Sequence, residues 1–203
     1  MERSSAFSPA PDWAPPNVAP AAAGALRPAV FLDRDGVLNR DRGYVAHARD
    51  FEFLPGILSA LQSLQAVGYP LVVVTNQSGI GRGYYNEEDY QTLTCWMREQ
   101  LLAAGIKLTA IYHCPHAPEL ACACRKPAPG MLLQAAREYQ LDLARSWMVG
   151  DKPSDMAAAR RAGVGRTVLV RSGKPLIDTS EADAICDSLA DFPQLLARSE
   201  ALR

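Results

Sequence analysis

Two acids separated by one residue, Asp33 and Asp35, directly follow an apolar run at 29–32. A buried strand that ends in Asp-x-Asp-Gly places carboxylates at the carboxyl edge of a sheet, where open α/β folds build their sites. Strand alternation would turn both side chains to one side, and such close like charges are costly without a cation or a shared proton. The pair therefore indicates a divalent-metal site with one acid free for chemistry, although a simple Asp-Gly turn would use the same residues.

Further polar side chains follow or lie beyond three later strands of the predicted sheet: Thr75 and Asn76, Arg125 and Lys126, and Asp151 and Asp155. Because the carboxyl ends of parallel strands face one way, all of these groups can converge on one crevice. Any single cluster is explained by capping or turn chemistry, but four together indicate an active site. Their types suit phosphoryl transfer, in which anionic oxygens are neutralised and a nucleophile is placed in line.

Each residue type has a chemical role in such a reaction. Asp33 can attack phosphorus as a covalent nucleophile, and Asp35 can protonate the leaving oxygen and then activate water. A magnesium ion held by few carboxylates, Asp151 among them, would neutralise the phosphate. Lys126 offers a compact positive charge, and Thr75 offers a hydrogen-bond donor.

The elements that must position these groups alternate along the chain. We expect strands at 29–32, 69–74, 108–112, 146–149 and 167–170. Helices are expected at 56–68, 86–105, 130–139, 156–162 and 189–196. This alternation predicts βαβ units, and hence an α/β fold with a three-layer, Rossmann-like parallel sheet.

Composition limits the class of protein. The 203 residues are 48% hydrophobic and 21% charged, with a net charge of −1, which is ordinary for a globular domain and gives no field that would attract nucleic acid or membranes. No transmembrane-length run and no signal peptide is present, so we expect a cytoplasmic monomer without a disulfide framework. Residues 1–27, rich in Pro and Ala, are predicted to be a disordered arm or a docking peptide, and 28–203 the folded domain.

Four potential metal ligands, Cys114, His116, Cys122 and Cys124, lie within eleven residues. Three thiols and one imidazole match a closed tetrahedral zinc site, whereas the alternative is spare thiols near an unrelated histidine. A four-ligand site has no open position, so we expect a structural ion that holds the basic pair after Cys124 against the crevice. The rival imidazole, His113, adjoins a strand and is expected to pack locally.

Four segments resemble, in order, the motifs of the haloacid dehalogenase superfamily of phosphatases: Asp33-Arg-Asp-Gly-Val, Thr75-Asn-Gln-Ser-Gly, Arg125-Lys-Pro and Gly150-Asp-Lys-Pro-Ser-Asp155. Asn39-x-Asp41-x-Gly43-Tyr44 and the Cys-Pro-His…Cys-x-Cys-Arg-Lys-Pro block are similar to the D-glycero-D-manno-heptose 1,7-bisphosphate 7-phosphatase family. This resemblance implies a magnesium-dependent hydrolase that removes the 7-phosphate of a heptose bisphosphate through an aspartyl-phosphate, in heptose nucleotide synthesis. No large insertion follows the first motif or separates the second from the third, so we expect short loops in place of a cap domain.

The resemblance assigns roles to individual residues. It makes Asp33 the nucleophile and Asp35 the acid/base, with magnesium on Asp33, the backbone carbonyl of Asp35, and Asp151. Thr75 and Lys126 would steady the phosphoryl group, and Asp155 would orient Lys126 or a bound water. The implied substrate-binding residues are Asp41, Arg42, Gly43, Tyr44, Thr75, Asn76, Gln77, Ser78, Arg125, Lys126 and Lys152.

Several alternatives stay open. Histidinol-phosphate phosphatase shares a similar zinc loop, and another small phosphomonoesterase or a non-catalytic zinc module would use the same scaffold. The 39–44 loop and Ser78 favour a heptose bisphosphate, a small phosphorylated sugar, as substrate. Arg82, Tyr84 and Tyr85 form either a substrate lip or an exposed loop. Two further cysteines are expected to be small core residues, Cys95 and Cys186.

Overall fold

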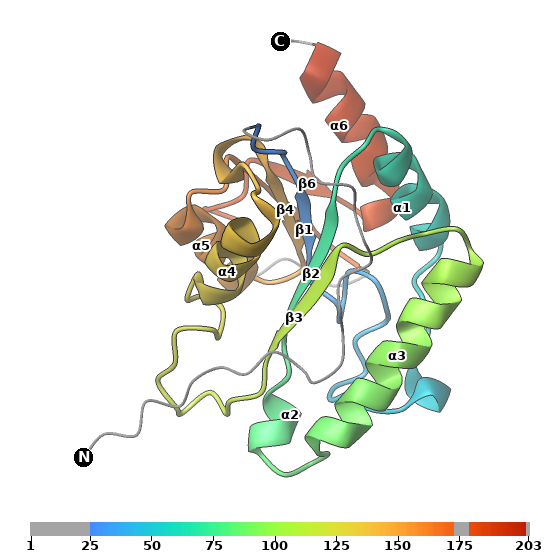
Figure 1. Cartoon of the computed structure of the whole chain (residues 1–203), viewed down its shortest axis with the longest axis vertical. Coiled ribbons are helices and arrows are strands. Elements are labelled where there is room, and N and C mark those ends of the chain that lie inside the picture. The colour runs from blue at the N-terminus through green and yellow to red at the C-terminus, as the bar shows by residue number, and fades with distance from the viewer. Residues whose placement is uncertain (1–24, 173–178, 202–203) are drawn as a thin grey trace.

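The computed structural model describes residues 25–172 and 179–201 and contains one parallel sheet of six strands (Figure 1). The strands are β1 Val30–Leu32, β2 Leu71–Asn76, β3 Ala110–Cys114, β4 Trp147–Gly150, β5 Arg166–Val170 and β6 Ala184–Cys186. Their spatial order is β3-β2-β1-β4-β5-β6, so the first strand lies between β2 and β4. The sheet therefore brings the segments that follow β1, β2 and β4 to one edge.

Helices cover both faces of this sheet, which confirms the predicted three layers (Figure 1). The helices are α1 Ile57–Ala66, α2 Ser78–Gly81, α3 Glu87–Ala103, α4 Gly130–Tyr139, α5 Pro153–Ala162 and α6 Phe192–Ala201. Alternation along β1 divides the core: Val30 and Leu32 pack with α1, α3 and α6, whereas Phe31 packs with α4 and α5. All three side chains are fully buried, as a strand covered on both faces requires.

Local sequence explains where the helices begin and end. The Asn86 side chain accepts a hydrogen bond from the Asp89 N–H at 2.8 Å, and the Asp89 carboxylate accepts one from the Asn86 N–H at 3.0 Å, so a capping box opens α3. At the other end of its helix, Gly163 ends α5 with a φ of 81°, a left-handed conformation that favours glycine.

Some details differ from the predictions. The third strand is shifted to Ala110–Cys114, and both α2 and β6 were missed because a single turn and a three-residue edge strand carry no periodic signal. Cys186 is buried as predicted, but the prediction for Cys95 is wrong: it is exposed, two residues off the buried stripe of α3 that includes Leu93 and Met97.

The predicted N-terminal arm falls mostly on residues 1–24, which lie outside the described residues. Arg27 is already held in place: its N–H donates to the Gln140 carbonyl at 3.2 Å, and its carbonyl accepts from the Asp142 N–H at 2.8 Å. Among the described residues, every helix is too short or too polar to cross a bilayer.

We expect Leu61→Ala in α1 to lower the free energy of unfolding by about 2–5 kcal/mol, because it leaves a cavity at a fully buried position. Leu58 lies on the same helix but is 37% exposed, so Leu58→Ala is the matched control, with a change within about 0.5 kcal/mol. Urea denaturation measures both. Equal losses in the two variants would contradict the assignment of the buried face.

Candidate active site

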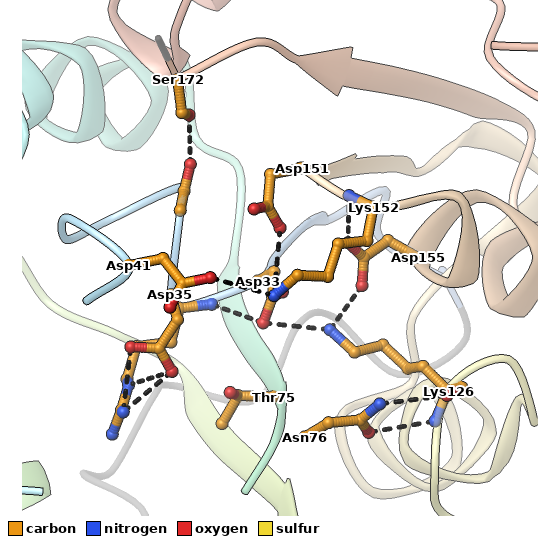
Figure 2. Close-up of polar contacts among 12 residues, drawn as sticks. Asp33, Asp35, Asp41, Thr75, Asn76, Lys126, Asp151, Lys152, Asp155 and Ser172 are labelled. Atoms are coloured by element: carbon orange, nitrogen blue, oxygen red, sulfur yellow. Dashed lines mark hydrogen bonds and ion pairs between the residues drawn. The ribbon is translucent and has the colours of Figure 1, made fainter. Parts of the chain in front are cut away.

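A cleft of about 690 Å³, including its open mouth, lies at the carboxyl ends of the central strands. Figure 2 shows that polar side chains from four segments of the chain point into this region. Within the described residues, loops form its rim. The lining residues are Asp33, Asp35, Asp41, Gly43, Tyr44, Thr75, Asn76, Gln77, Ser78, Tyr85, Lys126, Lys152, Ser154 and Asp155.

A buried cluster of one ammonium and two carboxylates forms the floor of the cleft. Lys126 Nζ lies 3.0 Å from Asp33 Oδ1 and 2.6 Å from Asp155 Oδ1, and it donates to the Val74 carbonyl at 2.7 Å. Lys126, Asp33 and Asp155 are at most 5% exposed. Burial alone would lower the pKa of Lys126, but Asp155 and Asp33 raise it. Burial raises the pKa of Asp33, and Lys126 opposes that rise.

A further carboxylate, that of Asp151, lies close to Asp33 at the strand ends. Carboxylate oxygens of Asp33, Asp151 and Asp155 lie within 4.8 Å of one another, and three hard oxygen donors so close suit a magnesium ion. Asp155 is engaged elsewhere, since it binds Lys126 and accepts from the Lys152 N–H at 3.0 Å. Asp33 and Asp151, the two side chains that the motifs predict as magnesium ligands, thus lie close together, and their role as ligands stays a prediction.

Two glycines make room for these carboxylates. A Cβ on Gly36, whose φ is +89°, would collide with the Asp151 carboxylate, and a Cβ on Gly150 would collide with Asp155. The Gly36 carbonyl also accepts a hydrogen bond from Ser172 Oγ (Figure 2). Gly36 thus does more than permit the expected turn, because it allows the turn after β1 to touch the segment after β4.

The second acid, Asp35, lies in the turn beyond β1 and lines the same cleft as Asp33, as predicted. Its carboxylate is 2.8 Å from Arg34 Nη2 and accepts from Asn39 Nδ2 at 2.9 Å and Gln77 Nε2 at 3.0 Å. Arg34 is only 1% exposed; burial would lower its pKa, but Asp35 raises it. Arg34 was missed in the sequence analysis, because a charged residue between two acids is typical of an exposed position.

The end of β2 and the residue that follows it line the cleft and also support neighbouring segments. Asn76 pairs with the main chain of Lys126, donating to its carbonyl at 3.0 Å and accepting from its N–H at 3.1 Å. Gln77 is buried and donates to Thr75 Oγ1 at 2.9 Å, while Tyr85 O–H donates to Gln77 Oε1 at 2.5 Å. Asn76 and Gln77, both predicted to bind substrate, line the cleft, and their amide groups bind the protein atoms named above.

The remaining residues implied for substrate binding divide into two groups. Asp41, Gly43, Tyr44, Ser78 and Lys152 line the cleft, and Lys152 Nζ lies 3.3 Å from Asp41 Oδ2. Arg42 and Arg125 are not among the lining residues of the described chain. Arg42 pairs with Glu52 at 2.6 Å, and Arg125 donates to the His116 carbonyl at 3.4 Å. Ser154 lines the cleft and was missed, since a small polar residue at a helix start suggests only capping.

The predicted metal loop brings its four side chains together. Five of the six distances among the sulfurs of Cys114, Cys122 and Cys124 and the Nδ1 of His116 run from 3.1 to 3.6 Å. Zinc–sulfur bonds of ~2.3 Å in a tetrahedron place ligand atoms roughly 3.7 Å apart, so the cluster could bind zinc. His113 packs locally, as expected, on Tyr90 with ring centroids 4.0 Å apart.

Comparisons with known proteins agree with this geometry. A family model described as HAD-hydrolase-like matches residues 123–192. The solved D,D-heptose 1.7-bisphosphate phosphatase from B. bronchiseptica, complexed with magnesium and phosphate, has a TM-score of 0.76 and 34% identity, and the match covers 85% of this chain and 99% of that chain. The sheet and the acid cluster thus define a hydrolase of the haloacid dehalogenase-like class.

Two curated relatives make the assignment finer. Proteins named D-glycero-beta-D-manno-heptose-1,7-bisphosphate 7-phosphatase from Photorhabdus laumondii and Escherichia coli (strain K12) are 49% and 48% identical over 178 and 182 residues. These matches cover 83% and 85% of this chain and 95% of each relative. The chain belongs to the D-glycero-beta-D-manno-heptose-1,7-bisphosphate 7-phosphatase family.

We expect Lys126→Met to lower the free energy of unfolding by about 3–5 kcal/mol at pH 7, because it leaves two buried carboxylates without their cation. Burial already raises the pKa of Asp33 above its ordinary value of 3.8, and losing Lys126 raises it further. Between the pKa of Asp33 in the unfolded chain and its raised pKa in the folded protein, the folded state binds more protons than the unfolded state. The stability of the folded state therefore falls as pH rises through this range. The difference in free energy of unfolding between wild type and Lys126→Met should therefore shrink toward pH 4.

Urea denaturation in the presence of a chelator, at pH 4 and pH 7, measures this effect without a competing cation. Lys107→Met is the matched control, because Lys107 is exposed and its loss should change stability by less than about 0.5 kcal/mol. A Lys126→Met deficit of the same size at both pH values would contradict the electrostatic explanation.

Proposed function

We propose that this chain is a magnesium-dependent phosphatase that hydrolyses the 7-phosphate of D-glycero-β-D-manno-heptose 1,7-bisphosphate. The observation that carries the proposal is the buried contact of Asp33 with Lys126, at 3.0 Å, next to Asp151 at the strand ends. Family membership supports the substrate, since the curated relatives carry this activity in their names. The cytoplasmic location and the monomeric state stay predictions of the sequence.

The proposed reaction has two displacements at phosphorus. An Asp33 carboxylate oxygen forms a bond to phosphorus as the bond from phosphorus to the sugar oxygen breaks, and Asp35 gives that oxygen its proton. Asp35 then takes a proton from water, whose oxygen displaces Asp33 and releases inorganic phosphate. Lys126 holds Asp33 and adds positive charge beside the transferring group. Asp33 and Asp151 would hold a magnesium ion, which would supply further charge neutralisation.

The four-ligand loop suits a structural zinc ion in this proposal. Cys114 ends β3, and Cys124 immediately precedes Arg125 and Lys126, so a bound ion would tie the catalytic lysine's segment to the sheet. Burial opposes ionisation of Cys122, but the Arg125 N–H and the neighbouring thiols lower its pKa. Burial raises the pKa of Cys114 and of Cys124, so zinc, which binds the thiolate form, would release protons from these two thiols on binding.

A phosphate-release assay tests the function. The wild-type enzyme should hydrolyse the β anomer of the heptose bisphosphate with a higher kcat/KM than the α anomer or histidinol phosphate. We expect Asp33→Asn to abolish turnover, because an amide oxygen does not attack phosphorus effectively, while circular dichroism and metal content stay unchanged.

Lys107→Met, on the exposed surface, should retain full activity and controls for handling of the variants. Preference for histidinol phosphate would reject the proposed substrate. Appreciable turnover by Asp33→Asn would reject Asp33 as nucleophile.

We expect Cys122→Ser to lose zinc and to unfold at a lower temperature, because three ligands hold the ion less tightly and metal binding contributes to folding. Cys95→Ser is the matched control, since Cys95 is exposed and lies outside the cluster. Elemental analysis and thermal denaturation give both readouts. A Cys122→Ser protein with wild-type stability and no zinc would argue against a structural ion.

A further inference from the structure

An aromatic ring stands at the rim of the cleft in an unusual backbone conformation. Tyr44 lines the cleft, is half exposed, and has a φ of 53°, which is uncommon for a bulky residue. Such a conformation persists only when the surroundings support it. An exposed ring beside a phosphate site suits the apolar C–H face of a sugar, so the position of this ring matters for a phosphorylated sugar.

The support for this ring comes from the turn after α2. The rings of Tyr44 and Tyr84 meet edge to face, with centroids 4.6 Å apart and an interplanar angle of 79°. Tyr84 is itself 60% exposed, so it is not held by burial in the core. Tyr84 lies two residues after Arg82 in this turn, and its N–H donates to the Gly79 carbonyl at 2.9 Å, so the main chain of the turn is docked on α2.

The metal loop in turn holds Arg82. Arg82 Nη2 lies 3.0 Å from Oε1 of Glu119, which is within the loop between His116 and Cys122. The Gly81 N–H donates to the Pro115 carbonyl at 2.8 Å, so the main chain of α2 is also docked on the start of this loop. Figure 1 shows α2 at the carboxyl ends of the strands, next to the segment that follows β3.

We propose that Arg82 and Tyr84 are positioning residues that hold the ring of Tyr44 against the sugar of the bound substrate. Through the Glu119–Arg82 ion pair, the metal loop then contributes to recognition of the sugar as well as to the position of Lys126. The inference rests on the proposed function, because it takes a phosphorylated sugar as the substrate. None of these positioning residues touches the transferring phosphoryl group, so their effect falls on KM and not on kcat.

Steady-state kinetics with heptose 1,7-bisphosphate tests this inference. Tyr84→Ala should raise KM about 3- to 10-fold with kcat within about twofold, the range expected for loss of one aromatic pair. Tyr84→Phe keeps the ring and should raise KM less. Inhibition by orthovanadate, which fills the phosphate position and carries no sugar, should be unchanged in both variants. Leu120→Ala, an exposed neighbour in the metal loop, is the control and should leave KM unchanged.

A double-mutant cycle tests the link to the metal loop. Glu119→Gln should raise KM in the wild-type background and have no further effect in Tyr84→Ala, because Glu119 acts on the ring of Tyr44 only through the turn that carries Tyr84. An unchanged KM in Tyr84→Ala, or an equal rise in its vanadate inhibition constant, would overturn the inference while leaving the proposed function intact. A wild-type enzyme that does not hydrolyse the heptose bisphosphate would overturn the proposed function and this inference with it.

Discussion

The structure depends on the burial of one ammonium group between two carboxylates. Lys126 has three N–H donors, and its three acceptors are Asp33, Asp155 and the carbonyl of Val74, all within 3.0 Å. Removing these charges from water costs several kcal/mol for each ion, and only such complete pairing offsets that cost. The acceptors come from the end of β1, from β2 and from α5. The charge on Lys126 is therefore fully paired only when these three elements are in their native arrangement.

Asn76 holds the main chain of that lysine. It binds both the N–H and the carbonyl of Lys126 from the end of β2, and the cysteine-rich loop, whose four side chains could hold a metal ion, ends two residues before Lys126. A flexible lysine side chain loses much conformational entropy when it is ordered, so prior fixing of its backbone reduces what the ion pair must overcome. Gly36 and Gly150 contribute in another way, by removing the side chains that would separate the acids from one another.

The sequence predicts the central strands and the motif residues that follow them because both signals are local. A continuous apolar run such as 71–74 and an acid pair directly after a strand need no knowledge of distant contacts. The features that were missed depend on side-chain contacts, which the local pattern of residue types does not show. Arg34 is buried only because Asp35, Val45 and Gln77 surround it, and Arg42 turns from the cleft because Glu52 binds it. The exposure of Cys95 follows from the rotation of α3, which its apolar stripe fixes and a lone cysteine does not.

The strand order has a consequence for how the molecule is made. The first strand in the chain lies between β2 and β4, so one side of it stays open until β4 has been synthesised. A nascent chain on the ribosome therefore exposes Asp33 and the cysteine cluster well before Asp151 and Asp155 exist. Lys126 likewise emerges with only one of its two acids available. Chemistry at this site consequently requires that α5 has left the exit tunnel, because α5 carries the second acid that pairs with Lys126.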